Sequence, residues 1–312
     1  MADIDRTPCP VSPTRPDPAR DAETCLSVGA RVDTSVAHPA RVYDALLGGK
    51  DNYAADRAVA SAMTVQVPTL PAQVRANRAF LHRAVRHLVR DHAITRFLDI
   101  GSGMPTADNV HQIAQRHHPV ERHQPGTHVV YVDNDPLVVA HGRAIAPATV
   151  HQRGRVEFVH ADARDPASIL TAPAVVDLLA ERRPVALMLV SVLMYFDDTE
   201  TTRILATLTA ALPPGSYVVI SHPTDEFSPT AARAAVTAAA ASGITYRPRT
   251  HQQVLHLFQG LDLEHPGVVP LTTWRPDQHP GLDPHSVYYW AGVGRVPPTT
   301  EVPAPRPRPG RT

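Results

Sequence analysis

The sequence is poor in several kinds of residue, and each shortage excludes a class of protein. Its 312 residues include two cysteines, Cys9 and Cys25, both in a proline-rich N-terminal stretch. Neither a disulfide framework nor a cysteine zinc site is therefore expected to hold the core. Lys50 is the only lysine, and 30 basic side chains balance 30 acidic ones. This balance predicts no attraction to nucleic acid or to an anionic membrane surface.

Long hydrophobic runs are also missing. The most apolar stretch, residues 185–196, is shorter than the roughly 20 residues that a helix needs to span a bilayer. The N-terminal sequence MADIDRTPCP lacks the basic start and the apolar run of a secretory signal. We therefore expect a soluble, cytoplasmic protein. Hydrophobic residues still make up 43% of the chain, which is enough for a sizeable core.

Prolines crowd both ends of the chain, and few bulky apolar residues accompany them. This composition predicts disordered tails at residues 1–36 and 296–312. Between the tails we expect an N-terminal helical segment at 37–92, followed by one α/β domain at 93–295.

Apolar periodicity gives the expected elements of this region. The N-terminal segment is predicted to hold helices at 40–47 and 51–62, separated by the flexible Gly48-Gly49 pair, and at 74–89. Strands are predicted at 97–101, 129–133, 156–160, 185–192, 217–221, 267–274 and 286–292. Further helices are predicted at 106–116, 136–146, 169–181, 199–212, 228–243 and 250–258.

The alternation of apolar strands with helices indicates a parallel sheet that helices cover on both faces. The last two strands have only a turn-rich stretch between them, so they pair as a hairpin and the final strand runs antiparallel.

A glycine turn follows the first strand, in the sequence DIGSGMPT. Gly101 and Gly103 allow the backbone to approach a ligand closely. The dinucleotide fingerprint needs a third glycine or alanine where Thr106 stands, and Asp133 lies 30 residues after Gly103 instead of roughly 20 after the fingerprint. A pyrophosphate cofactor is therefore disfavoured.

Polar residues stand at successive strand ends. Ligands of parallel sheets bind at the carboxyl ends of the strands, so these residues are expected to surround one cleft. They are Asp99, Asp133, Asn134, Asp162 and Ser191, with the small residue Ala163 directly after Asp162. Several carboxylates suit a cationic ligand that carries a diol. The alternative is that each acid only caps a helix or forms a turn.

The sequence resembles a known family in several motifs: PARVYDALLGGKDNYAADR, ANRAFL, FLDIGSGMPT, YVDNDP, VHADARDP and PPGSYVVISH. These are similar to the actinobacterial S-adenosylmethionine-dependent methyltransferases of the class I, Rossmann-like fold, and the resemblance covers roughly residues 38–292. It implies a seven-stranded, mostly parallel sheet with a reversed last strand. It also implies that S-adenosylmethionine binds at Asp99, Gly101 and Gly103, with Asp133, Asn134, Asp162 and Ala163 around the nucleoside.

One motif departs from this family. Many relatives carry Leu-His-Phe after the fourth strand, whereas this chain has Leu193-Met194-Tyr195. A histidine base is therefore missing there. Tyr195 is a catalytic candidate through its hydroxyl or its ring, and its alternative role is to seal the adenosine pocket. His222, beside acids after the fifth strand, is a second candidate as general base, although surface polarity explains it equally well.

The polar N-terminal helices predict a lid over the strand ends. Arg41, Tyr43 and Lys50 are the residues expected to reach the cofactor, with Lys50 bringing a cation to its carboxylate. A solvated helix with surface ion pairs is the alternative.

Together these features predict a methyltransferase that transfers the methyl group of S-adenosylmethionine in line to a small-molecule or peptide acceptor. A non-catalytic module that binds this cofactor and an NAD-dependent oxidoreductase are the alternatives. Neither nucleic acid nor a membrane is an expected partner, and the sequence does not indicate the oligomeric state. His117, His118, His123 and His128 lack the spacing of metal ligands, so no metal is expected.

Overall fold

The computed structural model describes residues 32–106, 108–118, 126–149, 154–277 and 283–298. Those from Asp33 onward belong to one compact unit. Cys9, Cys25 and His123 lie outside the described residues, as do most residues of the two predicted tails. In the described part of the chain, no helix is long and apolar enough to cross a membrane.

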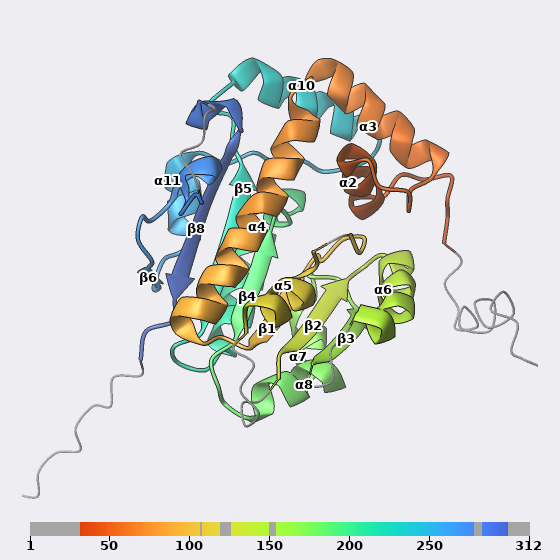
Figure 1. Ribbon diagram of the computed structural model, residues 1–312. Coiled ribbons are helices and arrows are strands. Elements are labelled where there is room, and N and C mark those ends of the chain that lie inside the picture. The colour runs from red at the N-terminus through yellow and green to blue at the C-terminus, as the bar shows by residue number, and fades with distance from the viewer. Residues whose placement is uncertain (1–31, 107, 119–125, 150–153, 278–282, 299–312) are drawn as a thin grey trace, which may run out of the picture. The chain divides into compact units, whose positions relative to one another are not determined.

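A central sheet organises this unit (Figure 1). Its described strands are β1 (Arg96–Ile100), β2 (His128–Asp133), β3 (Arg155–His160), β4 (Ala186–Val190), β5 (Tyr217–Pro223), β6 (Asp262–Leu263), β7 (Val269–Pro270) and β8 (Tyr289–Arg295). Their order is β3-β2-β1-β4-β5-β8-β6, with β7 also beside β8. The first five strands are parallel, and β8 runs antiparallel to β5. The predicted Rossmann-like α/β fold with a reversed last strand is confirmed.

The outer edge of the sheet differs in detail from the prediction. The strand expected at 267–274 is reduced to the two residues of β7, and β6 adds a second short piece beside β8, so eight strands are described instead of seven. Pro266 and Pro270 have no amide hydrogen to donate to a neighbouring strand, which keeps these pieces short. A 3-10 helix at Leu271–Thr273 then replaces the rest of the predicted strand.

The described α-helices are α2 (Pro39–Leu47), α3 (Ala54–Gln66), α4 (Leu70–His92), α5 (Val110–His117), α6 (Pro136–Thr149), α7 (Pro166–Thr171), α8 (Pro173–Ala180), α9 (Asp198–Ala210), α10 (Pro229–Ala240) and α11 (His251–His256). Each predicted helix is present with shifted ends, except that the one expected at 169–181 is split. Pro173 causes the split, because it forces Ala172 into an extended conformation, with ψ of 132°.

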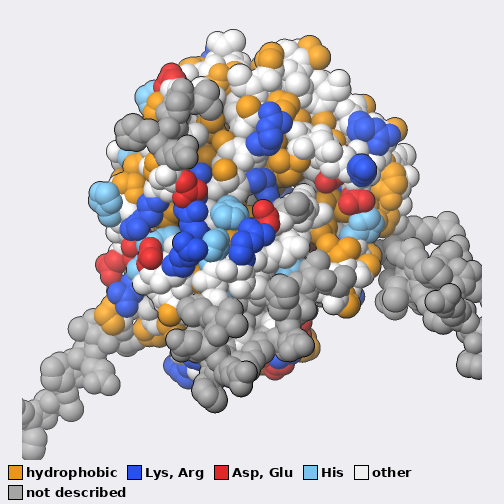
Figure 2. Space-filling model, in the orientation of Figure 1, with side chains coloured by type: hydrophobic (Ala, Val, Ile, Leu, Met, Phe, Trp, Pro, Cys, Tyr) orange, Lys and Arg blue, Asp and Glu red, His pale blue; other side chains and the backbone are white. Residues whose placement is uncertain are grey.

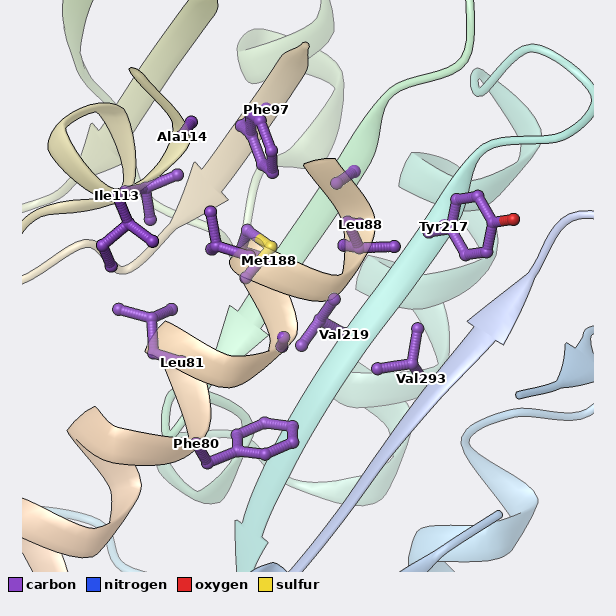
Figure 3. Close-up of a cluster of buried hydrophobic side chains, with 14 of the residues drawn as sticks. Phe80, Leu81, Leu88, Phe97, Ile113, Ala114, Met188, Tyr217, Val219 and Val293 are labelled. Carbon is purple, nitrogen blue, oxygen red and sulfur yellow. The ribbon is translucent and has the colours of Figure 1, made fainter. Parts of the chain in front are cut away.

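Alternate side chains of the strands fill cores on the two faces of the sheet. Figure 3 shows one core, in which Phe97 of β1, Met188 of β4 and Val219 of β5 meet Phe80 and Leu88 of α4. On the opposite face, side chains such as those of Leu98 and Leu187 pack with α7, α8 and α9. The core of one face thus includes the long helix α4 as an integral layer.

A third apolar cluster holds the N-terminal helices together. Val42 of α2, Met63 of α3 and Val74 of α4 pack there with Ala235 of α10. Figure 1 shows α2 and α3 beyond one end of the sheet, with α10 beside α3. This cluster places the polar residues of α2 near the carboxyl ends of the parallel strands.

Candidate active site

A cavity of about 300 Å³ lies at the carboxyl ends of β1, β2 and β4. The structure brings ten of the thirteen predicted site residues to its wall. They are Tyr43, Asp99, Gly101, Gly103, Asp133, Asn134, Asp162, Ala163, Ser191 and Tyr195. The other three, Arg41, Lys50 and His222, do not line it.

The turn after β1 depends on its glycines. Gly101 and Gly103 have φ of +66° and +69°, a region that other residues rarely adopt. A Cβ atom on Gly101 would lie 2.3 Å from a methyl carbon of Val192, which is too close for any side chain. The turn therefore leaves bare backbone at the cavity wall.

Asp133 ends β2 and fixes this turn from the neighbouring strand. Its Oδ2 accepts a hydrogen bond of 2.9 Å from the amide of Gly103, and its Oδ1 accepts one of 2.9 Å from the amide of Asp135. Burial raises the pKa of the Asp133 carboxyl, while these two hydrogen bonds act in the opposite direction. The carboxylate is therefore held in a fixed orientation at the edge of the cavity.

Asp99, in β1, is a second buried acid of the cavity. Burial raises its pKa to about 7, the Asp133 charge adds to the increase, and the Arg78 guanidinium lowers it. A bound cation would favour the ionised form of this carboxyl. A positively charged ligand beside Asp99 would therefore gain electrostatic attraction from this carboxyl.

The third acid, Asp162, is more exposed than the other two. It accepts a hydrogen bond of 2.8 Å from the amide of Arg164, and its Oδ2 lies 3.4 Å from the side-chain nitrogen of Asn134. Ala163 next to it is buried. These residues form the rim of the cavity on the side of β3.

The N-terminal helices supply the opposite wall. The hydroxyl of Tyr43 donates to the carbonyl of Val74 at 3.1 Å and accepts a hydrogen bond of 2.9 Å from Asn77. Asn77 in turn accepts a hydrogen bond of 2.6 Å from Ser221 of β5. A chain of hydrogen bonds thus connects α2 through α4 to the sheet.

Tyr195 and Ser191 lie at the end of the cavity that follows β4. Burial raises the pKa of Tyr195 well above its usual range, so its hydroxyl stays protonated at neutral pH. The hydroxyl of Ser191, whose backbone has φ of +57°, lies 3.1 Å from that of Tyr289. This end therefore offers neutral hydroxyls and aromatic rings.

Arg41 and Lys50 occupy other positions on the N-terminal segment. Arg41 is buried, and its Nε lies 3.0 Å from a carboxylate oxygen of Asp135, so it ties α2 to the turn after β2. Lys50 is exposed beyond the end of α2. The short turn that ends α2 at Gly48 carries Lys50 away from the cavity wall.

His222 is completely buried and does not line the cavity. Its Nδ1 lies 2.8 Å from the carbonyl oxygen of Pro223, and its Nε2 accepts a hydrogen bond of 2.7 Å from Arg249. Burial lowers its pKa to about 3, and the Arg249 charge adds to this effect. Both ring nitrogens are therefore engaged within the fold.

Sequence reasoning missed several residues of the cavity wall. Asn77 and Arg78 come from α4, and Arg164 and Phe196 complete the rim. Asn77 and Arg78 could have been predicted as site residues, since both lie in the motif ANRAFL. Asn77 is 2% exposed, and a buried polar side chain of this kind is rarely without a specific role.

Comparisons with known proteins agree with this geometry. A family model described as S-adenosyl methyltransferase matches residues 27–297. The crystal structure of a DUF574 family protein from Streptomyces avermitilis is 40% identical in sequence, covers 86% of this chain and 100% of that one, and superposes with a TM-score of 0.79. A candidate methyltransferase from Thermobifida fusca is 38% identical, with 85% and 97% of the two chains covered and a TM-score of 0.76.

A search of curated proteins gave no match. The family model spans well over half of the chain, and both solved relatives exceed 30% identity over most of it. The chain belongs to the S-adenosyl methyltransferase family.

Proposed function

We propose that this S-adenosylmethionine-dependent methyltransferase methylates a small, mainly apolar acceptor. The observation that carries the proposal is the composition of the cavity wall, with acids at the ends of β1 and β2 and after β3, Tyr43 from α2 and Tyr195 after β4. We also propose that the chain belongs to an actinobacterial branch of the family, because its two relatives come from Streptomyces and Thermobifida. A cytoplasmic location stays a prediction from the sequence.

The residues around the cavity fit S-adenosylmethionine. Within the described residues, the buried hydroxyl of Ser102 in the cavity wall has no hydrogen-bond partner, so it is available to a ligand. Asp133, Asn134, Asp162 and Ala163 would hold the nucleoside, while Asp99 and Arg78 would face its charged amino-acid part. The bound cofactor supplies a methyl group on a positively charged sulfur.

The acceptor is expected next to Tyr43 and Tyr195. A second, smaller recess shares these two residues with the cavity and continues between α2 and α10, where Met63, Tyr246 and Tyr289 line it. Its walls are apolar and aromatic, and it is narrow, at about 30 Å³. At this size the recess has room for only a small apolar group of an acceptor, and its uncharged walls do not suit a charged polymer.

Catalysis is proposed to depend on alignment and on exclusion of water. Tyr195 keeps its proton at neutral pH, so we propose that its hydroxyl orients the acceptor instead of acting as a base. We propose a structural role for His222, because Arg249 and Pro223 engage its ring. Alignment of two reactants in a dry cleft is worth up to roughly 7–11 kcal/mol, which suffices for an acceptor that is already nucleophilic.

The proposal is tested by calorimetry followed by methyl transfer. Titration of the full chain with S-adenosylmethionine, its demethylated product and NAD should show binding of the first two only. Protein with methyl-labelled cofactor is then incubated with a panel of small phenols, amines and thiols and, separately, with a mixture of peptides. Label in a small apolar compound is the expected result. Labelling confined to peptides would overturn the acceptor class, and preference for NAD would overturn the whole proposal.

A further inference from the structure

Two histidines and a glutamate gather at the edge of the sheet opposite to the cofactor cavity. His87 and His92 lie in the last turns of α4, and Glu264 follows the short strand β6. Tyr217, which contacts His92, is the first residue of β5, whereas the cavity lies at the other ends of the parallel strands. Acidic, basic and histidine side chains gather over this half of α4 (Figure 2).

Three atoms of this group point at one another. The Nε2 atoms of His87 and His92 are 3.1 Å apart, and they lie 3.8 Å and 3.6 Å from Oε2 of Glu264. A tetrahedral metal with bonds of about 2.1 Å holds its ligand atoms about 3.4 Å apart. The triangle formed by the three atoms therefore has the size of one face of a metal coordination sphere.

The remaining ring nitrogens of both histidines have partners that orient the rings. Nδ1 of His87 lies within hydrogen-bond distance of the Asp91 carboxylate, and Nδ1 of His92 lies 2.8 Å from the hydroxyl of Tyr217. Metal-binding histidines are held in this way, with one nitrogen on a carboxylate or hydroxyl and the other on the metal. Both Nε2 atoms are consequently directed to the same point.

Arg275 is a cation that competes with a metal ion for His87 and Glu264. Its guanidinium lies 3.2 Å from Nδ1 of His87 and 3.7 Å from Oε2 of Glu264. Without metal the two Nε2 atoms share a hydrogen bond of 3.1 Å. Oε2 of Glu264 forms only long ion pairs, at 3.6 to 3.8 Å from both Nε2 atoms and from the Arg275 guanidinium, where direct hydrogen bonds would be about 3.0 Å long. An ion that replaces the hydrogen bond therefore has room between the carboxylate and the imidazoles.

We propose that His87, His92 and Glu264 bind one divalent transition-metal ion of the zinc type. Two imidazoles and one carboxylate suit zinc, cobalt and nickel, whereas calcium and magnesium require mostly oxygen ligands. His92 and Glu264 are partly exposed, with 25% and 19% of their side chains accessible, so water can complete the coordination sphere. The ion joins the end of α4 to the segment after β6, and Tyr217 of β5 supports the ring of His92.

Because the proposed metal site lies away from the cofactor cavity, we infer that the metal has a structural role. The residues of α4 that line the cofactor cavity are Asn77, Arg78 and Leu81, in the first half and the middle of the helix, whereas His87 and His92 lie in its last turns. Metal binding therefore raises stability without entering the methyl-transfer site, because a ligand that binds only the folded state shifts the folding equilibrium. This inference does not depend on the proposed acceptor.

The test uses the untagged, full-length protein after removal of metal by a chelator. Zinc is titrated calorimetrically, cobalt is followed by the visible absorption of its tetrahedral complex, and thermal unfolding is measured with and without zinc. The expected result is one equivalent bound, a tetrahedral cobalt spectrum and a higher unfolding temperature with zinc.

Variants separate this site from adventitious binding. His92→Gln and Glu264→Gln change partly exposed residues, so the protein is expected to fold, and each should weaken zinc affinity at least tenfold. His256→Gln, at an exposed histidine of α11, is the matched control and should bind zinc as the unchanged protein does. Affinity for S-adenosylmethionine should stay unchanged in all three. Failure of the unchanged protein to bind one equivalent of zinc, cobalt or nickel would overturn the proposal, as would equal affinity in both site variants and the control.

Discussion

The amide of Gly103 donates a hydrogen bond of 2.9 Å to the carboxylate of Asp133, so the turn after β1 is tied directly to the end of β2. The same carboxylate also accepts a hydrogen bond from the amide of Asp135. The Asp133 side chain thus fixes the glycine turn and also lines the cavity. We expect its substitution to weaken cofactor binding both by loosening this turn and by removing a polar group from the cavity wall.

Asp133→Ala should weaken binding of S-adenosylmethionine at least tenfold, which corresponds to about 1.4 kcal/mol. The variant removes the hydrogen-bond acceptor that fixes the Gly103 amide and, in the proposed site, a charge-assisted contact to the nucleoside. Asp133→Asn keeps one oxygen for the Gly103 amide and should lose less affinity than Asp133→Ala. Calorimetry on variants with a native circular dichroism spectrum measures the effect. Equal affinity of Asp133→Ala and the unchanged protein would remove Asp133 from the site.

Arg78→Ala should weaken cofactor binding about tenfold or more, because it removes the guanidinium that lines the cavity near Asp99. Arg75→Ala is the matched control on the same helix, since Arg75 is exposed and does not line the cavity. Affinity for the demethylated product separates the two variants. A loss of the same size in both would indicate a general effect of charge on α4 and not a contact in the site.

Asp99 predicts a dependence of cofactor affinity on pH. Its carboxyl has a pKa of about 7 in the folded protein, so the ionised form that attracts a cation becomes dominant as the pH rises through 7. Affinity for S-adenosylmethionine should therefore increase between pH 6 and pH 8, and Asp99→Asn should weaken binding and flatten this dependence. Titrations at several pH values measure both effects. A flat profile in the unchanged protein would contradict the assignment.

The Asp99 carboxyl also predicts that the free energy of unfolding falls as the pH rises, whereas the cofactor affinity increases. Its folded-state pKa lies above the ordinary value of 3.8, so the folded protein binds more protons than the unfolded chain between about pH 4 and pH 7. The contribution of Asp99 to the free energy of unfolding therefore falls as the pH rises through this window. Without cofactor, Asp99→Asn should be at least as stable as the unchanged protein at pH 8. Thermal unfolding at pH 5 and pH 8 tests this, and a lower stability of the variant at pH 8 would contradict it.

Arg249 is expected to matter for stability. It is buried, and it donates to the carbonyls of Leu193 and Phe196 and to the ring of His222. Arg249→Met leaves several of these acceptors without a donor, so we expect a loss of about 2–4 kcal/mol in the free energy of unfolding.

His222→Gln provides the comparison in the same network. It should cost less stability than Arg249→Met, and affinity for S-adenosylmethionine should stay within about twofold. Chemical denaturation and calorimetry measure the two quantities. A loss of turnover in a stable His222→Gln protein, once an acceptor is known, would restore His222 as a catalytic candidate.

Local patterns in the sequence predicted the parts of the site that follow strands. Asp99, Asp133 and Asp162 were found because parallel strands bring their carboxyl ends to one edge, whichever helices lie between them. The interruption at Pro173 of the helix predicted at 169–181 could have been predicted from the same kind of local chemistry. The short pieces β6 and β7 were harder to predict, because pairing with β8 depends on partners elsewhere in the chain.

Residues whose roles depend on packing between distant segments could not be predicted in this way. The motif ANRAFL distinguishes Arg78 from the other arginines of α4, but its place in the cavity wall follows from the packing of this helix on the sheet. Arg41 meets Asp135 through the fold of α2 against the turn after β2. The burial of His222 depends on Arg249, which is 27 residues away in sequence.

The layer formed by α4 has a consequence for attempts to shorten the chain. Phe80, Ala84, Val85 and Leu88 are 0% exposed, and a buried leucine or phenylalanine side chain contributes roughly 1.5–3 kcal/mol each. Cutting at His92, where the predicted N-terminal segment ends, would strip one side of the sheet and leave a fragment prone to aggregate. A minimal fragment would have to start no later than Leu70, and it would also need α2 and α3 to keep the apolar side chains of Val74 and Ala235 covered.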